Sequence, residues 1–312
     1  MRRTRYATAA ALLAAGTFLA ACTSDAPDEG GDAGGDNGAD TGDDTGGDTG
    51  EDGGGETSTD GGAGAADGEG LTIGIKFDQP GLGYQDGSEF TGFDVDVAHY
   101  VAEHMGYSPD QITFVEAISA NRETMLQNGQ VDMIFATYSI TDERDEVVDF
   151  AGPYFVAGQD LLIRSDDEGT ITGPESLDGL NLCSVSGSTS AQRVQDEYSE
   201  GVQLIEQPGY SECIQYLIGG QVDAVTTDDI ILAGLAADEG SGALAVAGSP
   251  FSEERYGVGI PDGDTETCEQ INEAIQAMID DGAWEEAVTA NTEGTGFTPD
   301  ESLNPPELDS CS

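Results

Sequence analysis

Two stretches of the chain, LQNGQVDMIFATYS and LIGGQVDAVTTDD, repeat the same order of structural signals. Each begins at the end of a predicted helix, passes through Gly-Gln-Val-Asp, and continues as a buried strand with a polar end. Strand and helix patterns alternate throughout residues 71–292. Two α/β units of the same design predict two lobes, each of which directs the carboxyl end of a strand toward a common cleft.

The expected elements divide between these two lobes. Strands are expected at residues 71–77, 112–117, 131–139, 157–165, 181–188, 202–207, 222–228 and 255–262. Helices are expected at residues 93–106, 120–129, 141–150, 190–201, 210–220, 229–240 and 266–292. About 240 residues suffice for two cores, and we place lobe 1 at residues 71–159 and 252–312 and lobe 2 at residues 160–251. Two crossing segments, near Gly158–Leu161 and Pro250–Glu254, are expected to form a hinge.

The first 21 residues are typical of a secretory signal peptide. A basic segment, MRRTR, precedes the apolar segment YATAAALLAAGTFLA, and the signal closes with LAAC at Cys22. This ending resembles the lipobox of bacterial lipoproteins, where the signal is cut before the cysteine and the thiol is acylated. The alternative is an ordinary signal peptide with an incidental cysteine. No other stretch approaches the ~18 apolar residues of a membrane span, so we expect a lipid anchor on the extracellular face of the cell membrane.

The segment that follows has a composition that does not support a core. Residues 22–70 begin with the lipidated Cys22, and Thr23 to Gly70 consist almost wholly of Gly, Asp, Glu, Thr, Ala and Ser. Such a segment buries too little apolar area to offset the entropy of the chain. We expect a disordered acidic tether that repels itself.

The charge balance excludes some partners. The sequence has 62 acidic against nine basic residues, a formal charge of −53. A field of this sign excludes nucleic acid and anionic membrane surfaces as partners. Two explanations of the acidic excess remain: a high-salt habitat, where screening removes the self-repulsion, or a benefit to solubility alone. Three of the bases lie in the first five residues, and the others are Lys76, Arg122, Arg144, Arg164, Arg193 and Arg255.

Four cysteines remain beyond Cys22, and an even number in an exported protein favours disulfides. Three pairings are possible. We favour Cys183–Cys213 together with Cys268–Cys311, because each bridge then stays within one predicted lobe. A zinc site is the competing interpretation, but no paired Cys or His spacing supports it.

The sequence lacks the motifs of the common enzyme classes. It has no GxGxxG after a strand, no phosphate-binding loop, no GxSxG and no cluster of metal ligands. Neither histidine lies beside a predicted nucleophile, so acid–base and covalent catalysis lack their usual residues. We therefore expect a protein that is not an enzyme and has no cofactor and no metal.

The positions of three bases suggest ligand contacts. Lys76 falls at the end of the first strand, Arg122 at the start of a helix, and Arg144 just after the strand at 131–139. α/β folds build ligand sites at such positions, and the planar guanidinium of Arg144 suits the two oxygens of a carboxylate. For Arg164, Arg193 and Arg255 we expect pairing with surface acids.

Three long motifs carry a family resemblance. FTGFDVDVAHYVAEHMG, NGQVDMIFATYSITDERDEVVDFAGPYF and GGQVDAVTTDDIIL resemble the extracellular solute-binding proteins of polar amino acid ABC transporters, family 3. The match covers residues 71–300 in order, and IGIKFDQPGLGY, SANR and YSEC are most similar to actinobacterial glutamate-binding lipoproteins. The resemblance implies a type II periplasmic-binding-protein-like α/β fold with two lobes, two hinge segments and a ligand cleft between them.

The resemblance also implies which residues hold the common part of an amino acid. Arg144 matches the arginine that pairs with the α-carboxylate, and Ser139 matches the hydroxyl beside it, which is usually Thr. In the SGSTS turn, the backbone N–H groups of Ser188, Thr189 and Ser190 would meet the same carboxylate at a helix start. Asp228 matches the acid that binds the α-ammonium.

Other positions implied by the resemblance concern the rest of the ligand. The carbonyl of Thr137 would assist Asp228, and Tyr210 would reach the ligand from lobe 2. Lys76, and Arg122 with Ser119 nearby, would bind a second carboxylate, and a glutamine would leave these cations partly unpaired at a cost of about 1–3 kcal/mol. For an aromatic contact the candidates are Phe77, Tyr84 and Tyr138.

The expected function is that of a monomeric, lipid-anchored binding protein that carries L-glutamate to an ABC permease and its ATPase. Closure of the lobes would bring Arg144, the SGSTS amides and Asp228 together. The rival ligands are aspartate, glutamine or another polar amino acid. The rival classes are an enzyme on the same fold, such as a dehydratase, and a sensory module.

Overall fold

The computed structural model describes residues 70–198 and 201–311, all within one structural unit. The predicted signal peptide at 1–21, the predicted lipidation site Cys22 and the predicted tether up to residue 69 lie outside the described residues. No helix in the described residues is both long and apolar enough to cross a membrane.

The first sheet contains five strands in the order β4-β1-β5-β12-β6. Strands β4, β1 and β5 are parallel, and β12 is antiparallel to both of its neighbours. Their bounds are β1 Leu71–Ile75, β4 Ile112–Glu116, β5 Met133–Ser139, β6 Asp149–Ala157 and β12 Glu254–Ile260. Every residue of β5 is buried, as expected for the central strand of a sheet that is covered on both faces. This sheet and its helices form lobe 1.

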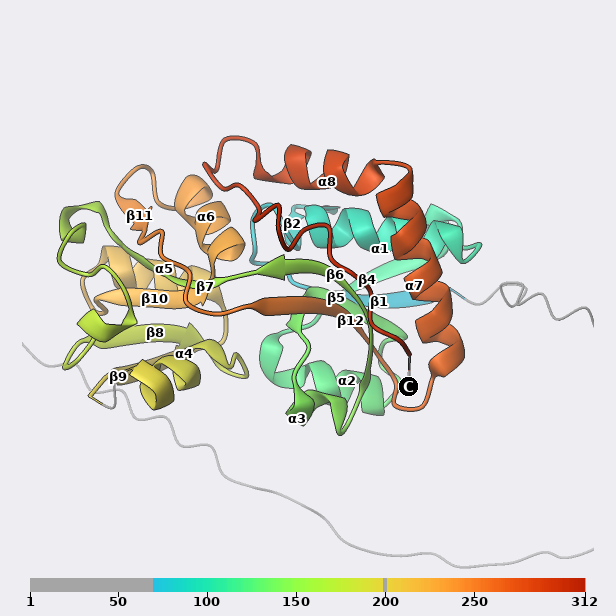
Figure 1. Cartoon of the computed structure of the whole chain (residues 1–312), viewed down its shortest axis with the longest axis horizontal. Coiled ribbons are helices and arrows are strands. Elements are labelled where there is room, and N and C mark those ends of the chain that lie inside the picture. The colour runs from blue at the N-terminus through green and yellow to red at the C-terminus, as the bar shows by residue number, and fades with distance from the viewer. Residues whose placement is uncertain (1–69, 199–200, 312) are drawn as a thin grey trace, which may run out of the picture. The chain divides into compact units, whose positions relative to one another are not determined.

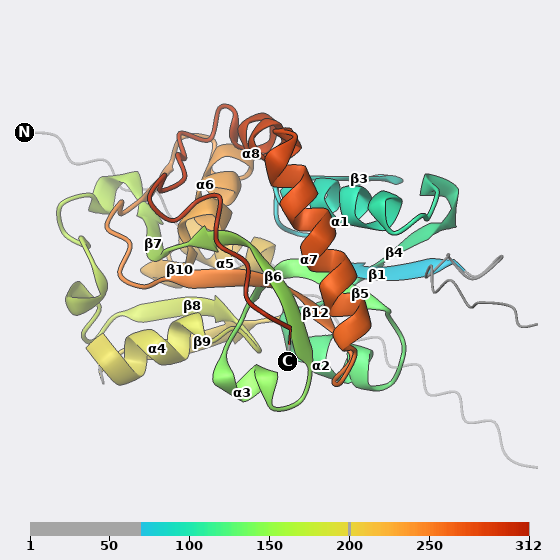
Figure 2. The same cartoon turned by 45° about the vertical axis from the view of Figure 1, so that its right-hand side comes forward.

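Helices cover both faces of the first sheet (Figures 1 and 2). Helices α1, α7 and α8 pack against one another on one face, and α2 and α3 lie on the other. Their bounds are α1 Phe93–His104, α2 Arg122–Gln127, α3 Asp142–Asp145, α7 Thr265–Asp280 and α8 Ala283–Thr292. Phe93 at the start of α1 contacts the rings of Tyr154, Phe155 and Trp284, which joins the helix layer to β6.

The second sheet, which forms lobe 2, has the order β11-β7-β10-β8-β9. Strands β10, β8 and β9 are parallel, and β7 is antiparallel to β10 and β11. The strand bounds are β7 Gln159–Arg164, β8 Asn181–Val185, β9 Gln203–Gln207, β10 Ala224–Asp228 and β11 Leu244–Val246. Helices α5 and α6 lie on one face and α4 on the other (Figure 1), at α4 Ser190–Arg193, α5 Tyr210–Ile218 and α6 Asp229–Asp238.

Two chain crossings join the lobes and lie against each other. Strand β6 ends at Ala157 and β7 begins at Gln159, so Gly158 alone separates the sheets on the first crossing. The second crossing is the segment between β11 and β12, and its Phe251 N–H donates to the carbonyl of Gln159. A Cβ on Gly158 would lie 2.6 Å from Cβ of Pro250, so only glycine lets the two crossings pack this closely.

The chain beyond α8 covers the outer edge of the first sheet, where an exposed strand β6 would offer unpaired backbone groups. Asn304 accepts a hydrogen bond from the N–H of Val156 and donates one to its carbonyl. Farther along, the Asp309 N–H donates to the Gly152 carbonyl. The Cys268–Cys311 disulfide then ties the end of this segment to α7. The second disulfide, Cys183–Cys213, joins β8 to α5, so both favoured pairings are present.

Several local expectations were wrong. The expected helix at 141–150 is the single turn α3, and the chain returns as strand β6, which the sequence analysis did not assign. The expected helix at 190–201 is α4 followed by a wider π-helical turn, Val194–Tyr198. The hairpin of β2 Tyr84–Asp86 and β3 Glu89–Thr91, strand β11, and the short 3₁₀ turns were also not predicted. These turns are Pro109–Gln111, Ser119–Asn121, Ser165–Asp167 and Pro174–Ser176.

Candidate functional site

A small cavity lies between the lobes, and the ends of β5 and β10 both reach it. The space between its side chains measures about 300 Å³, with its opening to solvent included. Residues of both lobes line it: Gln79, Ser119, Arg122, Thr137, Ser139, Arg144, Ser188, Thr189, Ser190, Tyr210, Thr227, Asp228 and Ile231. The structure therefore gathers around one cavity the polar ligand contacts expected from the sequence, with the exception of Lys76.

Arg144 is held in place at the boundary between the lobes. The hydroxyl of Thr141 caps the short helix α3 by accepting from the Arg144 N–H. The guanidinium donates to the Ser139 carbonyl at 2.7 Å and, across the cleft, to the Gly187 carbonyl at 3.1 Å. Its Nε lies 3.5 Å from Glu123 Oε1, and Arg144 is 8% exposed. This geometry fixes a charged fork beside Ser139 at the cavity wall.

The turn after β8 offers fewer free amides than expected. The Ser188 N–H donates to the Val185 carbonyl, and the Ser190 N–H donates to the Ser188 hydroxyl. Among the described residues, the Thr189 N–H has no acceptor. The turn requires Gly187, whose φ is +82°, and a Cβ there would lie 2.6 Å from the backbone of Ala120 in lobe 1.

Lys76 lies one hydrogen bond behind the cavity wall. It is 3% exposed, and its ammonium donates to the hydroxyl of Ser119, which does line the cavity. Burial, followed by the charge of Arg122, lowers the pKa of Lys76 to about 7. Within the described chain, Lys76 forms no ion pair with a carboxylate.

Arg122 is a second buried cation without a carboxylate partner in the described residues. It is 3% exposed, and its guanidinium carbon lies 4.0 Å from the centre of the Tyr138 ring. The terminal nitrogen Nη1 of the guanidinium donates to the Ala136 carbonyl. Its Nε is buried and has no hydrogen-bond partner among the described residues. Burial and the nearby Arg144 lower the pKa of Arg122 to about 10. Such a group is costly to bury unless an anion joins it.

Asp228 supplies the opposite charge at the end of β10, where it also precedes the first residue of α6. It is 4% exposed and accepts a 2.6 Å hydrogen bond from the Tyr256 hydroxyl of lobe 1. Burial and the neighbouring Glu254 raise the pKa of Asp228 to about 8. A cationic ligand group at this carboxylate would favour its ionised form.

Thr137 has a strained backbone. Its φ is +44°, a conformation that is rare for a β-branched residue and that costs about 1–3 kcal/mol. The fully buried Asp94 holds it by accepting from the Thr137 N–H and from the Tyr154 hydroxyl. Burial raises the pKa of Asp94 to about 6. Strained backbone conformations cluster at ligand-binding and active sites, so the strain at Thr137 supports a functional role for this part of the cavity wall.

Tyr210 links the cavity to the contact between the lobes. Its hydroxyl donates to Thr227, another lining residue, and its backbone N–H donates to Asp78 of lobe 1 at 2.7 Å. The hydroxyl of Thr137 donates to the side-chain oxygen of Gln79, and both residues line the cavity. The lobes are therefore in contact around the cavity, as in a closed arrangement.

The other predicted contacts require corrections. Arg164 pairs with Asp167 and Asp223, and Arg255 pairs with Asp309, as expected of surface pairs. Arg193 fits that expectation only in part, because it pairs with the exposed Glu197 at 4.0 Å and also with the buried Glu254. None of the three aromatic candidates lines the cavity: Phe77 packs on Phe90, Tyr84 lies in the hairpin, and Tyr138 lies beneath the two arginines.

Sequence reasoning missed Gln79, Thr227 and Ile231 in the wall, and Asp94 behind it. Gln79 lies in a loop after β1, and Ile231 reads as an ordinary core position of a helix. Thr227 adjoins Asp228 at the same strand end, which was the one available signal. The described residues contain no cluster of three or more His, Cys, Asp or Glu side chains suited to a metal.

Comparison with known proteins agrees with this fold. Residues 71–291 match the family of bacterial extracellular solute-binding proteins, family 3. The glutamate-binding protein GluB of Corynebacterium efficiens is 46% identical over 237 residues, which cover 73% of this chain and 80% of that protein. The glutamine-binding protein GlnH of an ABC transporter in Bacillus subtilis is 36% identical and covers 72% and 81%.

A solved structure shows the same fold. An ancestral arginine-binding protein bound to arginine superposes with a TM-score of 0.65 at 31% identity, and the match covers 72% of this chain and 98% of that one. The predicted two-lobed α/β fold and the resemblance to actinobacterial glutamate-binding proteins are thereby confirmed. The chain belongs to the bacterial extracellular solute-binding proteins of family 3.

Proposed function

We propose that this protein is the substrate-binding component of an ABC importer and that it binds L-glutamate in the cavity between its lobes. The observation that carries the proposal is the pair of buried cations, Lys76 and Arg122, which have no carboxylate partner among the described residues. Relatives that are named as glutamate-binding and glutamine-binding proteins support an amino acid ligand.

The charges of the cavity match those of glutamate. Arg144 would pair with the α-carboxylate, together with Ser139 and the Thr189 amide, and Asp228 would receive the α-ammonium. The side-chain carboxylate would then lie toward Arg122 and Ser119, with Lys76 reached directly or through the serine hydroxyl. Each buried cation gains a partner, so ligand binding removes an unfavourable feature of the ligand-free site.

The same reasoning ranks the rival ligands. Glutamine presents a neutral amide to Arg122 and Lys76, which leaves the Arg122 charge poorly compensated and does not stabilise the charged form of Lys76, at a cost of about 1–3 kcal/mol or more. Aspartate carries the second carboxylate but is one methylene shorter, a difference that usually changes affinity by about 10–200-fold. Glutamate is therefore the expected ligand.

A screen of amino acids by thermal shift tests the proposal. We expect L-glutamate to raise the melting temperature of the purified protein most, followed by L-aspartate and then L-glutamine. The ligand recovered after incubation should be chemically unchanged when analysed by mass spectrometry, because we propose binding without conversion. A larger shift with a cationic or apolar amino acid would contradict the ligand assignment, and turnover would favour an enzyme on the same fold.

We also propose a lipid anchor at Cys22, a monomeric state, and a location on the extracellular face of the cell membrane, where the permease with its ATPase would receive the ligand. The support is the LAAC sequence at residues 19–22. In the producing cell, the wild-type protein should partition into the detergent phase of a phase-separation assay, and Cys22→Ser should move it to the aqueous phase. Wild-type protein in the aqueous phase would contradict the anchor.

A further inference from the structure

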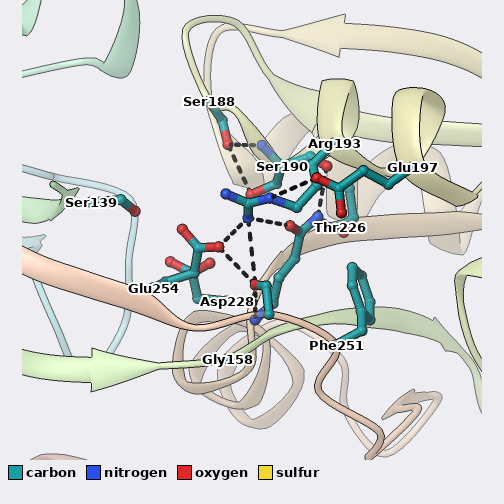
Figure 3. A network of polar contacts seen from close by, with 12 residues as sticks. Ser139, Gly158, Ser188, Ser190, Arg193, Glu197, Thr226, Asp228, Phe251 and Glu254 are labelled. Atoms are coloured by element: carbon teal, nitrogen blue, oxygen red, sulfur yellow. Dashed lines mark hydrogen bonds and ion pairs between the residues drawn. The ribbon is translucent and has the colours of Figure 1, made fainter. Parts of the chain in front are cut away.

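A polar network outside the cavity wall joins the hinge to lobe 2 (Figure 3). Arg193, the last residue of α4, donates to Glu254 at the start of β12 and to the side-chain oxygen of Gln159 at 2.9 Å. Ser252 in the second crossing donates to the same Glu254 oxygen at 2.7 Å. Glu254 is 3% exposed, whereas the Arg193 side chain is 22% exposed and extends inward from α4 toward it (Figure 3).

The network adjoins the carboxylate at which we place the ligand ammonium. Glu254 and Asp228 are both buried, and no hydrogen bond joins them. Burial, and then the Glu254 charge, raises the pKa of Asp228, whereas Arg193 acts in the opposite direction. The titratable groups that face Asp228 are Glu254 and Tyr256 from β12, Asp229 from α6, Arg193 from α4 and Tyr210 from α5.

We propose that Arg193 is a positioning residue for the ammonium subsite: it neutralises the buried Glu254, so that Asp228 is the one carboxylate there left to pair with a single positive charge. This inference rests on the proposed function, because it requires a ligand ammonium at Asp228. Without Arg193, two buried carboxylates would compete, and a proton would occupy one of them in place of the ligand.

Gln159 connects Arg193 to α4 and β10, the two elements of lobe 2 that we place beside the ligand. While its oxygen accepts from Arg193, its amide nitrogen donates to the Ser190 carbonyl at 2.6 Å and to the Thr226 hydroxyl at 3.0 Å. Ser190 begins the helix beside the carboxylate-binding turn, and Thr226 lies two residues before Asp228. Arg193 therefore orients the amide that holds these two elements in register.

The first test is the pH profile of glutamate affinity in Arg193→Met, measured by calorimetry on the purified protein. Loss of the positive charge raises the pKa of Asp228 above its wild-type value. We expect affinity to fall on the order of 10-fold or more at about pH 7 and the deficit to shrink as the pH rises toward 9. Arg193→Lys should recover most of the affinity. A loss that is the same at every pH indicates a structural effect only and would overturn the proposal.

A double-mutant cycle separates charge from packing. With Glu254→Gln present, the carboxylate that Arg193 neutralises is gone, so adding Arg193→Met should cost much less affinity than it does in the wild type, and the cost that remains measures the hydrogen bond to Gln159. The double variant should bind glutamate more tightly than Arg193→Met alone and recover most of the factor that the single variant lost. The first of these two comparisons uses only Glu254→Gln and the double variant, so it holds even if Arg193→Met alone does not fold.

Arg255→Met is the matched control, since Arg255 pairs with the half-exposed Asp309 far along the chain. It should leave both affinity and pH profile unchanged. Additive losses in the cycle would overturn the role of Arg193 while the proposed function stands. If the wild-type protein binds no amino acid, the proposed function itself fails, and the control series makes the two results distinguishable.

Discussion

Lys76 is a lysine whose charge depends on what occupies the cavity. Its pKa is lowered to about 7 by burial and by Arg122, so near neutral pH a large part of the population is uncharged. A ligand carboxylate nearby stabilises the ammonium form and raises this pKa again. Asp228 behaves in the opposite way, because a ligand ammonium removes the proton that its raised pKa retains. Glutamate binding is therefore coupled to two proton transfers of opposite sign.

Lys76→Met should change the proton balance of binding. In the wild type at about pH 8, uptake at Lys76 offsets release at Asp228, and the variant keeps only the release. We expect the number of protons released on glutamate binding to increase by up to about one in Lys76→Met. Calorimetry in two buffers of different ionisation enthalpy measures this number. Equal proton release in the two proteins would show that Lys76 does not sense the ligand.

The sequence predicted residues at the ends of strands and missed those that act from elsewhere. Arg144 and Asp228 follow buried strands, so their positions at a cleft follow from the α/β pattern. Asp94 lies in an amphipathic helix, where one acid among many gives no sign that it is buried beneath Thr137. The buried partner of Arg193 was missed for a related reason, since Glu254 is 61 residues away and nothing in the sequence marks this acid as buried.

Between the elements, close approach of the two lobes depends on glycine. Gly234 lies within α6 of lobe 2, and a Cβ there would come within 2.2 Å of the Pro80 carbonyl oxygen in lobe 1. Gly187 and Gly209 meet lobe 1 in the same way, with Ala120 and Asp78 as their neighbours. In a helix interior, alanine is favoured over glycine by roughly 0.5–1 kcal/mol. Contact between the lobes accounts for a glycine that the helix alone disfavours.

Gly234→Ala should weaken ligand binding without destabilising the protein. The added methyl group obstructs contact between the lobes but suits α6, so we expect an equal or higher melting temperature without ligand. Glutamate affinity should fall on the order of 10-fold or more, because strain of about 1–3 kcal/mol then opposes the closed state. Gly219→Ala is the control, since the atoms nearest to its Cβ belong to Gln221 and Gln215 of the same lobe. Unchanged glutamate affinity in Gly234→Ala would show that closure does not need this contact.

Whether a helix or strand could be predicted depended on how clearly its sequence pattern marks it. The long amphipathic and fully buried segments, such as α7 and β5, give clear patterns. Strand β6 was missed because Pro153 interrupts its pattern, and proline is confined to edge strands or bulges. The strand is indeed at the edge of its sheet, where the chain around Asn304 supplies the hydrogen bonds that a neighbouring strand would make.

At the scale of the whole molecule, stability depends on a large excess of acidic groups. The formal charge is −53, and several carboxyls are buried. Burial raises the pKa of Asp94 and of Asp229 to about 6, and that of Asp228 to about 8 with the help of Glu254. A raised carboxyl pKa contributes stability that is complete below the unfolded pKa and is lost as the pH rises through the folded pKa. Lys76 acts oppositely, since its lowered pKa destabilises the fold most below about pH 7.

The ligand-free protein should therefore be more stable in mild acid than in weak base. We expect its melting temperature to rise as the pH falls from about 8 to about 5, because three raised carboxyl pKa values and the reduced self-repulsion outweigh the single lysine. At pH 8, salt should also raise the melting temperature, since the screening length falls from about 10 Å at 0.1 M to about 3 Å at 1 M. Calorimetric scans measure both effects. A melting temperature that falls on acidification, or is insensitive to salt, would contradict this account.

If the buried cations Lys76 and Arg122 select a ligand with a second carboxylate, the protein must bind glutamate more tightly than glutamine. Calorimetric titration of the wild-type protein should give a preference for glutamate on the order of 10- to 100-fold or more. Arg122→Met should remove most of that preference through loss of glutamate binding, with glutamine affinity largely kept. Equal affinity of the wild type for both amino acids, or a preference for glutamine, would contradict the assignment of Lys76 and Arg122 to the side-chain carboxylate.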